Sequence, residues 1–339
     1  DEKDIPAKEI TAEDCMKLMK GKKGTKVKLG IQRMGEKKPL YYTITRGDIP
    51  VHSIEATYML TPETGYVKIK SFSETTYPEL LVALAELNQK GFKNLVIDLR
   101  DNTGGIMQTA IQMANIFLPK NRLILYTEGR KFPREEYKSD GRGAFPNLPL
   151  TVLVNEGSAS ASEIVSGALQ DWDRAIIVGR RSFGKGLVQR QYLLPDGSAL
   201  RLVIARYHTP SGREIQRPYV KGGDRTAYRT HSLPDTIPSP AYRTLRTGRT
   251  VYGGGGIAPD VCVIQDTVQA SYLNALLRKN IFPEFMQHYL DRTRAALERD
   301  YPEFASFEER FEVPDEMYEE LIGLGLEQGV TPPAEASDV

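Results

Sequence analysis

The chain has 339 residues, with 45 Lys and Arg side chains against 44 Asp and Glu, which gives a formal net charge of +1. This near-neutral charge excludes a broadly basic nucleic-acid-binding protein and an acidic disordered chain. No apolar run approaches the roughly 18 residues of a membrane span. The 40% hydrophobic fraction is ordinary for a globular protein, and a chain of this length predicts two or three domains.

Cysteine and histidine give no sign of a metal site. The two cysteines are too few for a disulfide framework or a four-thiolate zinc site, and the four histidines show no ligand-like spacing. We therefore expect no metal or organic cofactor. The chain begins Asp1-Glu2-Lys3 without an apolar signal segment, so we expect a mature or shortened form of the protein.

The first 50 residues form a small unit of their own. Thr11 to Asp14 has the spacing of a capping box and predicts a short helix that ends near Gly21. Alternation over residues 26–32 and 40–45 predicts two strands. One helix and two strands are too little for a stable domain, so we expect a missing part upstream.

From about residue 51 to 210, strand and helix patterns alternate, which predicts an α/β core with largely parallel strands. Strands are predicted at 66–70, 94–99, 122–126, 150–154 and 175–178, and helices at 78–90, 106–118 and 160–172. Residues 186–193 and 199–207 then alternate on either side of a Pro-Asp-Gly turn, which predicts a β-hairpin.

The last third of the chain has less regular patterns. Residues 211–256 read as a long irregular insertion, centred on about 220–250, before a short strand at 261–264. Three or four helices are predicted over 267–329, followed by a disordered tail at 331–339. The predicted domains are therefore residues 1–50, 51–265 and 266–339.

A run of serines follows one predicted strand, in the sequence Gly157-Ser-Ala-Ser-Ala-Ser-Glu163. Ser160 and Glu163 have capping-box spacing, which places Ser160 at a helix N-terminus. Free backbone N–H groups there favour negative charge, and a nucleophilic serine needs such donors for the oxyanion of a tetrahedral intermediate. Alternatively, Ser158 or Ser160 is only a helix cap. The Gly-x-Ser-x-Gly elbow of the α/β-hydrolases is absent.

A nucleophilic serine needs a base, for which the sequence offers a histidine and a lysine. His208 is the only histidine near the core segments, but an isolated histidine is more often a packed or surface residue. Lys185 lies between two glycines, where burial could lower its pKa from about 10.4 toward 7–8. Alternatively, Lys185 is a solvated turn residue. Gln189 shares a face with Lys185 if the predicted strand begins early enough, and it would then orient the lysine; otherwise it is an ordinary solvent-facing glutamine.

A second turn could supply further donors. In Asp98-Leu-Arg-Asp-Asn-Thr-Gly-Gly105 a buried strand ends in a glycine pair, and a helix follows. A backbone N–H of Gly104 or Gly105 could complete an oxyanion hole with that of Ala161. The alternative is a simple turn in which glycine permits unusual dihedral angles.

One motif imitates a nucleotide site. Gly179-Arg-Arg-Ser-Phe-Gly-Lys-Gly186 has the G-x-x-x-x-G-K spacing of a phosphate-binding loop. Position 186 is Gly, where Mg²⁺ binding needs Ser or Thr. The residues after Lys185 alternate as a strand, whereas a phosphate loop opens a helix. Both features count against nucleotide binding. A nucleotide-binding protein would be stabilised against thermal unfolding by ATP.

Several ordered motifs together resemble the C-terminal processing (tail-specific) serine protease family, over about residues 5–265. The segments that carry the resemblance are Asp98–Gly105, Gly157–Glu163, Phe183–Gly186, Asp196–Leu200, Thr209–Arg213 and Gly256–Asp260. Each motif alone is weak, and their order and spacing make the resemblance specific.

The resemblance implies a Ser–Lys dyad in which Ser160 is the nucleophile, Lys185 is the base and Gln189 supports the lysine. It also implies an oxyanion hole at Ala161 and the Gly104-Gly105 turn. The implied core is a Clp protease/crotonase-like α/β fold. The sequence patterns add a β-hairpin extension and a C-terminal helical region to it, and the helical region lies outside the shared motifs. The family's PDZ domain binds the substrate C-terminus and can gate the site. Residues 5–50 resemble only the second half of that domain, so we expect an intact dyad with an impaired gate.

The sequence therefore predicts a serine endopeptidase that cleaves protein or peptide substrates near their free C-termini through an acyl-enzyme. The resemblance further suggests the periplasmic side of a bacterial cell envelope. The near-neutral charge predicts no nucleic-acid partner, and a homo-oligomer is one expected state of assembly. The alternative is a catalytically silent protein-binding scaffold on the same fold, which a long distance between Ser160 and Lys185 would favour.

Overall fold

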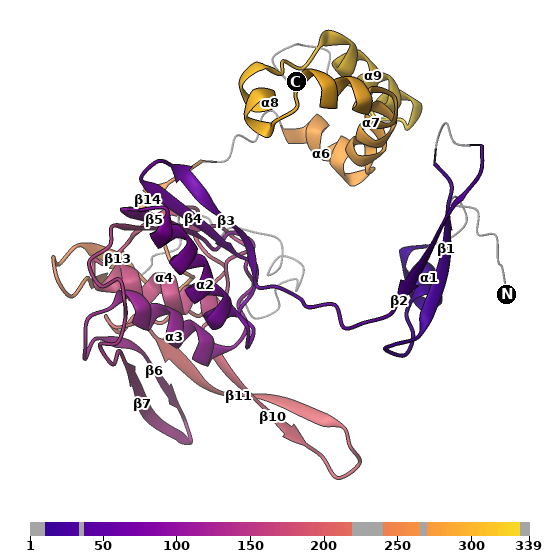
Figure 1. The fold of residues 1–339 in the computed structure, drawn as a ribbon. Helices are drawn as coiled ribbons and strands as arrows, with labels where there is room; N and C mark the ends of the chain where they lie inside the picture. Colours follow the sequence, from indigo (N-terminus) through magenta and orange to yellow (C-terminus); the bar gives the residue numbers. More distant parts are fainter. Residues whose placement is uncertain (1–10, 34–36, 219–239, 265–269, 333–339) are drawn as a thin grey trace. The chain divides into compact units, whose positions relative to one another are not determined.

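The structure, a computed structural model, describes residues 11–33, 37–218, 240–264 and 270–332. The chain divides into two compact units, of which Val51–Ile264 is one. The other is made of Asp1–Pro50 and Gln265–Val339. Figure 1 labels the helices and strands of each.

A six-stranded sheet forms the centre of the Val51–Ile264 unit, in the order β14-β9-β8-β5-β4-β3. Neighbouring strands from β14 to β4 are parallel, and only β3 runs antiparallel to its neighbour β4. The strands are β3 (Ile54–Thr61), β4 (Thr64–Ile69), β5 (Asn94–Asp98), β8 (Leu150–Val154), β9 (Ile176–Gly179) and β14 (Val261–Cys262). The predicted α/β class with largely parallel strands is confirmed.

Three helices pack on this sheet: α2 (Thr76–Gln89), α3 (Met107–Phe117) and α4 (Ala161–Asp171). Their apolar faces and the strand residues form one buried cluster, to which strand residues Ile97, Val152 and Ile177 contribute fully buried side chains. Every residue of α4 is buried. A helix enclosed on all sides holds its N-terminus rigidly, and that N-terminus follows the serine run.

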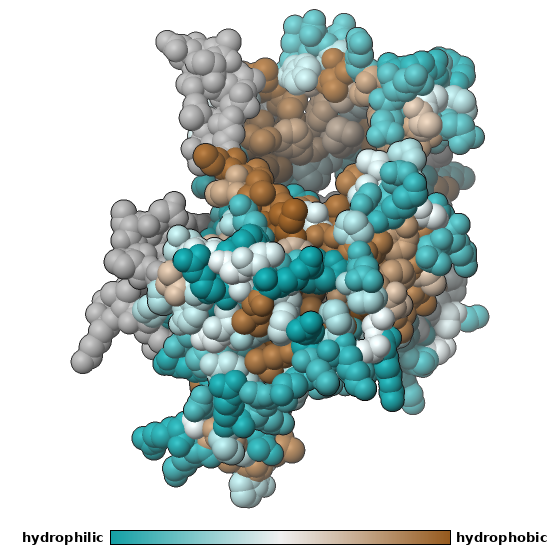
Figure 2. Space-filling view, turned by 90° about the vertical axis from the view of Figure 1, so that its left-hand side faces the viewer, coloured by the Kyte–Doolittle hydropathy of each residue, from teal (hydrophilic) through white to brown (hydrophobic). Residues whose placement is uncertain are grey.

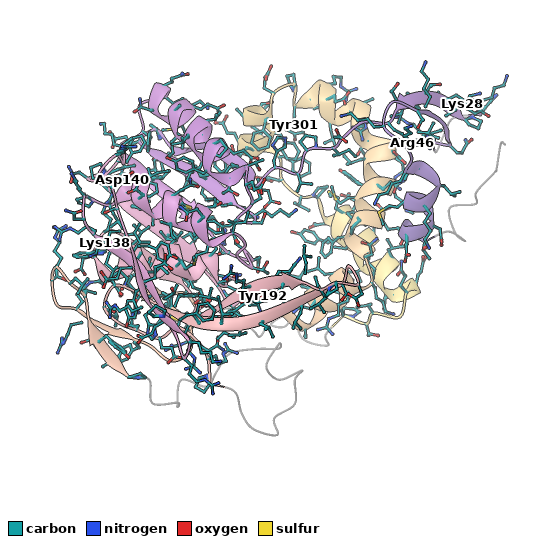
Figure 3. All side chains as sticks on the ribbon, turned by 90° about the horizontal axis from the view of Figure 1, so that it is seen from below. Lys28, Arg46, Lys138, Asp140, Tyr192 and Tyr301 are labelled. Carbon is teal, nitrogen blue, oxygen red and sulfur yellow. The ribbon has the colours of Figure 1, made fainter. Side chains whose placement is uncertain are left out.

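A second, antiparallel sheet has the order β10-β11-β6-β7. Its strands are β6 (Leu123–Gly129), β7 (Phe132–Lys138), β10 (Leu187–Leu193) and β11 (Ala199–His208). The predicted hairpin is confirmed as β10 and β11, and Figure 1 shows its tip projecting from the unit. In Figure 3, Tyr192 lies on this hairpin, while Lys138 and Asp140 mark the end of β7.

The structure corrects the sequence prediction in three places. Strands β3 and β7 were not predicted. The region 211–256, predicted to be irregular, contains the short antiparallel pair β12 (Ala241–Arg243) and β13 (Thr250–Tyr252). Residues 219–239 of that region lie outside the described part of the chain.

Near the N-terminus, α1 (Ala12–Met19) precedes the antiparallel pair β1 (Lys26–Ile31) and β2 (Leu40–Thr45). The Thr11 hydroxyl accepts a hydrogen bond from the Asp14 backbone N–H at 3.2 Å, as the capping pattern predicted. The tip between β1 and β2, residues 34–36, lies outside the described part of the chain.

Four helices follow near the C-terminus: α6 (Ala270–Arg278), α7 (Ile281–Asp300), α8 (Phe304–Arg310) and α9 (Asp315–Glu327). Leu276, Ile281 and Val330 form their own small buried cluster. Most of the predicted tail, residues 333–339, is not described. None of the helices in the described ranges combines the length and hydropathy that a membrane span requires. The face drawn in Figure 2 is mainly hydrophilic, with hydrophobic side chains gathered in separate patches.

Candidate active site

The three serines of the run differ in what their hydroxyl groups bind. The Ser158 hydroxyl donates to the Leu99 carbonyl at 2.7 Å, and the Ser162 hydroxyl donates to the Asn102 carbonyl at 2.8 Å. Both side chains are buried. Ser160 is only partly buried. It forms a capping box with Glu163 at the start of α4, and in the described residues its hydroxyl proton is not donated to a buried carbonyl group as those of Ser158 and Ser162 are. Ser160 is therefore the serine of this run whose oxygen is available for chemistry.

Ser160 also has an unusual backbone conformation. Its φ of 56° and ψ of −110° precede the first residue of α4. The other described non-glycine residues with positive φ are Asp or Asn, which tolerate this region better than serine. Such strain costs about 1–3 kcal/mol and is found where function needs a side chain in a fixed place.

Glu163 follows Ser160 by three residues. Its side chain is fully buried and accepts four hydrogen bonds. Its Oε2 atom accepts from the backbone N–H groups of Ser160, at 2.7 Å, and of Lys185, at 2.9 Å. Its Oε1 atom accepts from the Ser182 hydroxyl, at 2.6 Å, and from the Gly184 N–H, at 2.7 Å. Burial raises the pKa of the Glu163 carboxyl, and these hydrogen bonds oppose the rise. Because all four partners are donors, the group fits as a carboxylate, which has only acceptors.

The shared carboxylate brings the backbones of Ser160 and Lys185 together. Two nitrogens bonded to one oxygen lie no farther apart than the sum of the two hydrogen-bond lengths. Lys185 is partly buried. No hydrogen bond joins its ammonium group to the Ser160 hydroxyl among the described residues, and catalytic contacts are often long in proteins without substrate.

Gln189 is not placed as the alternation argument required. Strand β10 begins at Leu187, so Lys185 precedes the strand, and the pairing shifts between Val188 and Gln189. Even spacing along a regular strand therefore does not apply. Gln189 is exposed, and no hydrogen bond joins its side chain to Lys185 in the described ranges.

The glycine turn lies directly against the serine. A Cβ atom added to Gly104 would come within 2.8 Å of the Ala161 nitrogen and of Ser160 Cβ. The Gly104 N–H donates to the Asn102 side-chain oxygen at 2.9 Å. The Gly105 N–H has no partner among the described residues. Ala161, the first residue of α4, has an N–H that needs no partner within the helix. The amides of Gly105 and Ala161 are therefore the ones that remain available.

His208 lies in a different setting. Its ring stacks on Tyr126 with centroids 4.7 Å apart, and Nδ1 lies 3.4 Å from the Gly212 carbonyl oxygen.

The segment with phosphate-loop spacing, Gly179 to Gly186, leads into strand β10 and not into a helix, as the sequence predicted. In the described ranges, no three His, Cys, Asp or Glu side chains are grouped as metal ligands would be.

The sequence pattern predicts Glu163 only as a helix cap and gives no role in the site to Asn102. The capping-box spacing could have pointed to Glu163, since it places a carboxylate under the serine. No sequence signal identifies Lys185 and Gly184 as further partners of that carboxylate, because these contacts join residues more than twenty positions apart in the sequence.

Comparisons with known proteins found a peptidase family and several named relatives. Residues 63–223 match Peptidase family S41, and residues 272–339 match a family of unknown function (DUF8443). The carboxyl-terminal-processing protease of Synechocystis is 36% identical over 216 residues, which are 63% of this chain and 50% of that protein. The carboxy-terminal processing protease CtpA of Bacillus subtilis is 36% identical over 246 residues, 72% of this chain and 51% of that protein.

A solved structure, the photosystem II D1 C-terminal processing protease, is 26% identical with a TM-score of 0.48. The alignment covers 73% of this chain and 58% of that one. The chain spans about half the length of the curated relatives it matches. The matched segment, residues 63–223, contains the serine run, the glycine turn and Lys185, and it identifies a Peptidase family S41 domain in this chain.

Proposed function

We propose that this chain is a serine endopeptidase that cleaves protein substrates near their C-termini, with Ser160 as nucleophile and Lys185 as base. The observation that carries the proposal is the difference in burial and hydrogen bonding among the three serines of the run. Ser158 and Ser162 are buried and bonded to carbonyl groups, whereas Ser160 is strained, partly exposed and positioned at the N-terminus of α4. The names of the relatives support the reaction class.

In the proposed reaction, Lys185 in its neutral form takes the Ser160 proton while Oγ attacks a peptide carbonyl. The N–H groups of Ala161 and of the Gly104-Gly105 turn hold the oxyanion, and the free amide of Gly105 favours that glycine as the donor. Lys185 then gives its proton to the leaving amine. Water attacks the acyl-enzyme with Lys185 again as base, and the acid product leaves. Gln189 retains its proposed role of supporting Lys185 only if β10 moves when substrate binds.

A groove of about 410 Å³ offers a place for the substrate chain. It lies between the β6–β7 and β10–β11 hairpins of the antiparallel sheet. Its lining includes Met107, two residues after the Gly105 amide, and Val188, three residues after Lys185. The lining is mixed, because Phe132 and Ile204 are apolar whereas Arg134, Glu135 and Arg190 are charged. We propose that apolar residues of a substrate contact the apolar part of this lining.

We also propose the type of core fold, the identity of the N-terminal unit and the cellular location. The Val51–Ile264 unit is proposed to have the Clp protease/crotonase type of core. Residues 1–50, with one helix and an antiparallel strand pair, are proposed to be the second half of a PDZ domain. The proposed location is the periplasmic side of a bacterial cell envelope, with free C-termini as substrates, no nucleic acid as partner and homo-oligomerisation as an open possibility.

The test is cleavage of an unstructured protein with an apolar C-terminus by this chain and by its Ser160→Ala variant. Cleavage by the parent alone supports both the reaction class and the nucleophile. Equal cleavage by both proteins would show that another residue attacks. If neither cleaves, the same pair is tested with the upstream PDZ half restored, and inactivity there would reject the proposal.

A further inference from the structure

Tyr207 forms a second link between the two residues of the proposed dyad. This side chain comes from strand β11 and is 2% exposed. Its hydroxyl lies 2.6 Å from the Lys185 carbonyl oxygen and 3.0 Å from the Ser160 carbonyl oxygen. A hydroxyl carries one proton, so the two carbonyl groups share a three-centre hydrogen bond. Burial raises the pKa of Tyr207 well above its ordinary value, which keeps the hydroxyl protonated as a donor.

The same two residues are thus joined through both kinds of backbone group. One oxygen of Glu163 accepts from the N–H groups of Ser160 and Lys185. One hydroxyl, that of Tyr207, donates to the carbonyl groups of Ser160 and Lys185. Two buried side chains therefore link two residues that lie 25 positions apart. The Ser160 carbonyl also accepts from the backbone N–H groups of Glu163, at 2.9 Å, and Ile164, at 3.0 Å, in the first turn of α4, so Tyr207 joins Lys185 to a carbonyl that the helix already holds.

We propose that Glu163 and Tyr207 are positioning residues that hold the backbones of Ser160 and Lys185 at a fixed separation for the reaction. This inference rests on the proposed function. The side chains of Ser160 and Lys185 have no direct hydrogen bond among the described residues, so their approach depends on how firmly the two backbones are held. A shift of one ångström in such a pair is enough to lower a rate substantially.

The pairing also explains why Ser160 can keep its strained φ. A residue in a costly backbone conformation persists only when its surroundings fix it. Here the N–H of Ser160 is fixed by Glu163, and its carbonyl by Tyr207 together with the first backbone N–H groups of α4, while Gly104 lies against its Cβ. The backbone of the serine is thus held on several sides.

Two variants test the proposal. Tyr207→Phe removes only the hydroxyl, and Glu163→Gln replaces one acceptor oxygen with a donor that faces other donors. The chain offers matched controls. Tyr66 is 8% exposed and its hydroxyl donates to Asp98 at 2.6 Å. Glu79 Oε2 accepts from the N–H groups of Ser53 and Ile54 at 2.7 and 2.9 Å, the same lengths that Glu163 Oε2 shows. The controls are Tyr66→Phe and Glu79→Gln.

Steady-state kinetics on an unstructured fluorogenic peptide with an apolar C-terminus would separate kcat from KM, and thermal melting would report folding. We expect Tyr207→Phe to lower kcat more than tenfold and Glu163→Gln to lower it further, with KM changed less than threefold. The controls should stay within twofold of the parent in both constants. If Glu163→Gln does not fold, the milder Tyr207→Phe decides.

Three results would overturn the proposal in different ways. Parental kcat in Tyr207→Phe, with Ser160→Ala inactive, would leave the proposed function standing and reject the positioning role. Equal losses in the test and control variants would show that general destabilisation causes them. A parent no more active than Ser160→Ala would reject the proposed function, and this inference with it.

Discussion

At the scale of single residues, Ser160 and Lys185 acquire their proposed roles from their surroundings, since serine and lysine are common on any protein surface. The flanking serines satisfy buried carbonyl groups, and Glu163 fixes the turn from below. What distinguishes Ser160 is that its hydroxyl, unlike those of Ser158 and Ser162, donates to no buried carbonyl group in the described part of the chain.

The proposed base can be tested by changing its ability to lose a proton. Lys185→Ala removes the amine, and Lys185→Arg keeps a positive charge that cannot be given up near neutral pH. We expect both variants to lose about 100-fold or more in kcat and to melt within a few degrees of the parent, as measured by peptide cleavage and circular dichroism. His208→Ala is the control and should retain activity. An inactive His208→Ala with an active Lys185→Arg would reverse the assignment.

Gly104 is expected to be required for a steric reason. Its φ is +94°, and an added Cβ would meet the Ala159 carbonyl oxygen at 2.5 Å and the Ala161 nitrogen at 2.8 Å. Gly197 is the matched control, because its φ is +83° and an added Cβ would have no neighbour within 4 Å. Gly197→Ala should cost about 1–2 kcal/mol of stability and leave kcat unchanged.

Gly104→Ala should cost more stability than its control and should lower kcat at least tenfold, because the crowded atoms belong to the turn that carries Ser160. Urea denaturation and peptide cleavage would measure the two effects. Equal behaviour of the two alanine variants would mean that the close packing around Gly104 has no bearing on the reaction.

At the scale of elements, the two ends of the β10–β11 hairpin in the antiparallel sheet have different surroundings. The base of the β10–β11 hairpin lies next to Lys185 and lines the groove, whereas its tip is exposed, with Leu193 78% accessible. Substrate binding should therefore depend on the groove side chains and not on the tip.

Phe132→Ala shortens a groove side chain at the start of β7. We expect KM for a peptide with an apolar C-terminus to rise roughly tenfold with kcat changed little, because lost apolar contact weakens ground-state and transition-state binding alike. Leu193→Ala at the hairpin tip should leave both constants near those of the parent. A fall in kcat alone for Phe132→Ala would place this side chain in the chemical step and not in substrate binding.

Regular elements with clear periodicity could be predicted from the sequence, and edge elements could not. Residues 94–98 and 150–154 are short apolar runs that only a buried strand explains. Strand β7 carries Pro133 and four charged residues, which local patterns assign to a loop; its pairing with β6 overrides that preference. The same holds for the site. Ser160, Lys185 and the glycine turn have local signals, whereas the partners of Glu163 and Tyr207 arise from tertiary contacts.

At the scale of the whole molecule, the two units have separate hydrophobic clusters. The single tryptophan of the chain, Trp172, belongs to the Val51–Ile264 unit, where its indole N–H donates to the Leu123 carbonyl at 2.7 Å. Tryptophan fluorescence therefore reports the unfolding of that unit alone, while far-ultraviolet circular dichroism also reports the C-terminal helices.

Ile281→Ala opens the C-terminal cluster at a fully buried residue. We expect this to destabilise helices α6 to α9 by about 2–5 kcal/mol, so that the circular dichroism signal changes at lower urea concentration. The fluorescence transition and peptide cleavage should stay as in the parent. A fluorescence midpoint that moves together with the circular dichroism midpoint would show that the two units unfold cooperatively.

The order of the site along the chain has a consequence for biosynthesis. Gly104 and Glu163 precede or closely follow the nucleophile, but the other partners come later: Ser182, Gly184 and Lys185 close on Glu163, and Tyr207 arrives last. On the proposed arrangement, a polypeptide still emerging from the ribosome carries the serine before its base and before the Tyr207 link between the two. Proteolytic competence would then begin only when the unit has finished folding, which protects a newly made protease from its own unfinished copies.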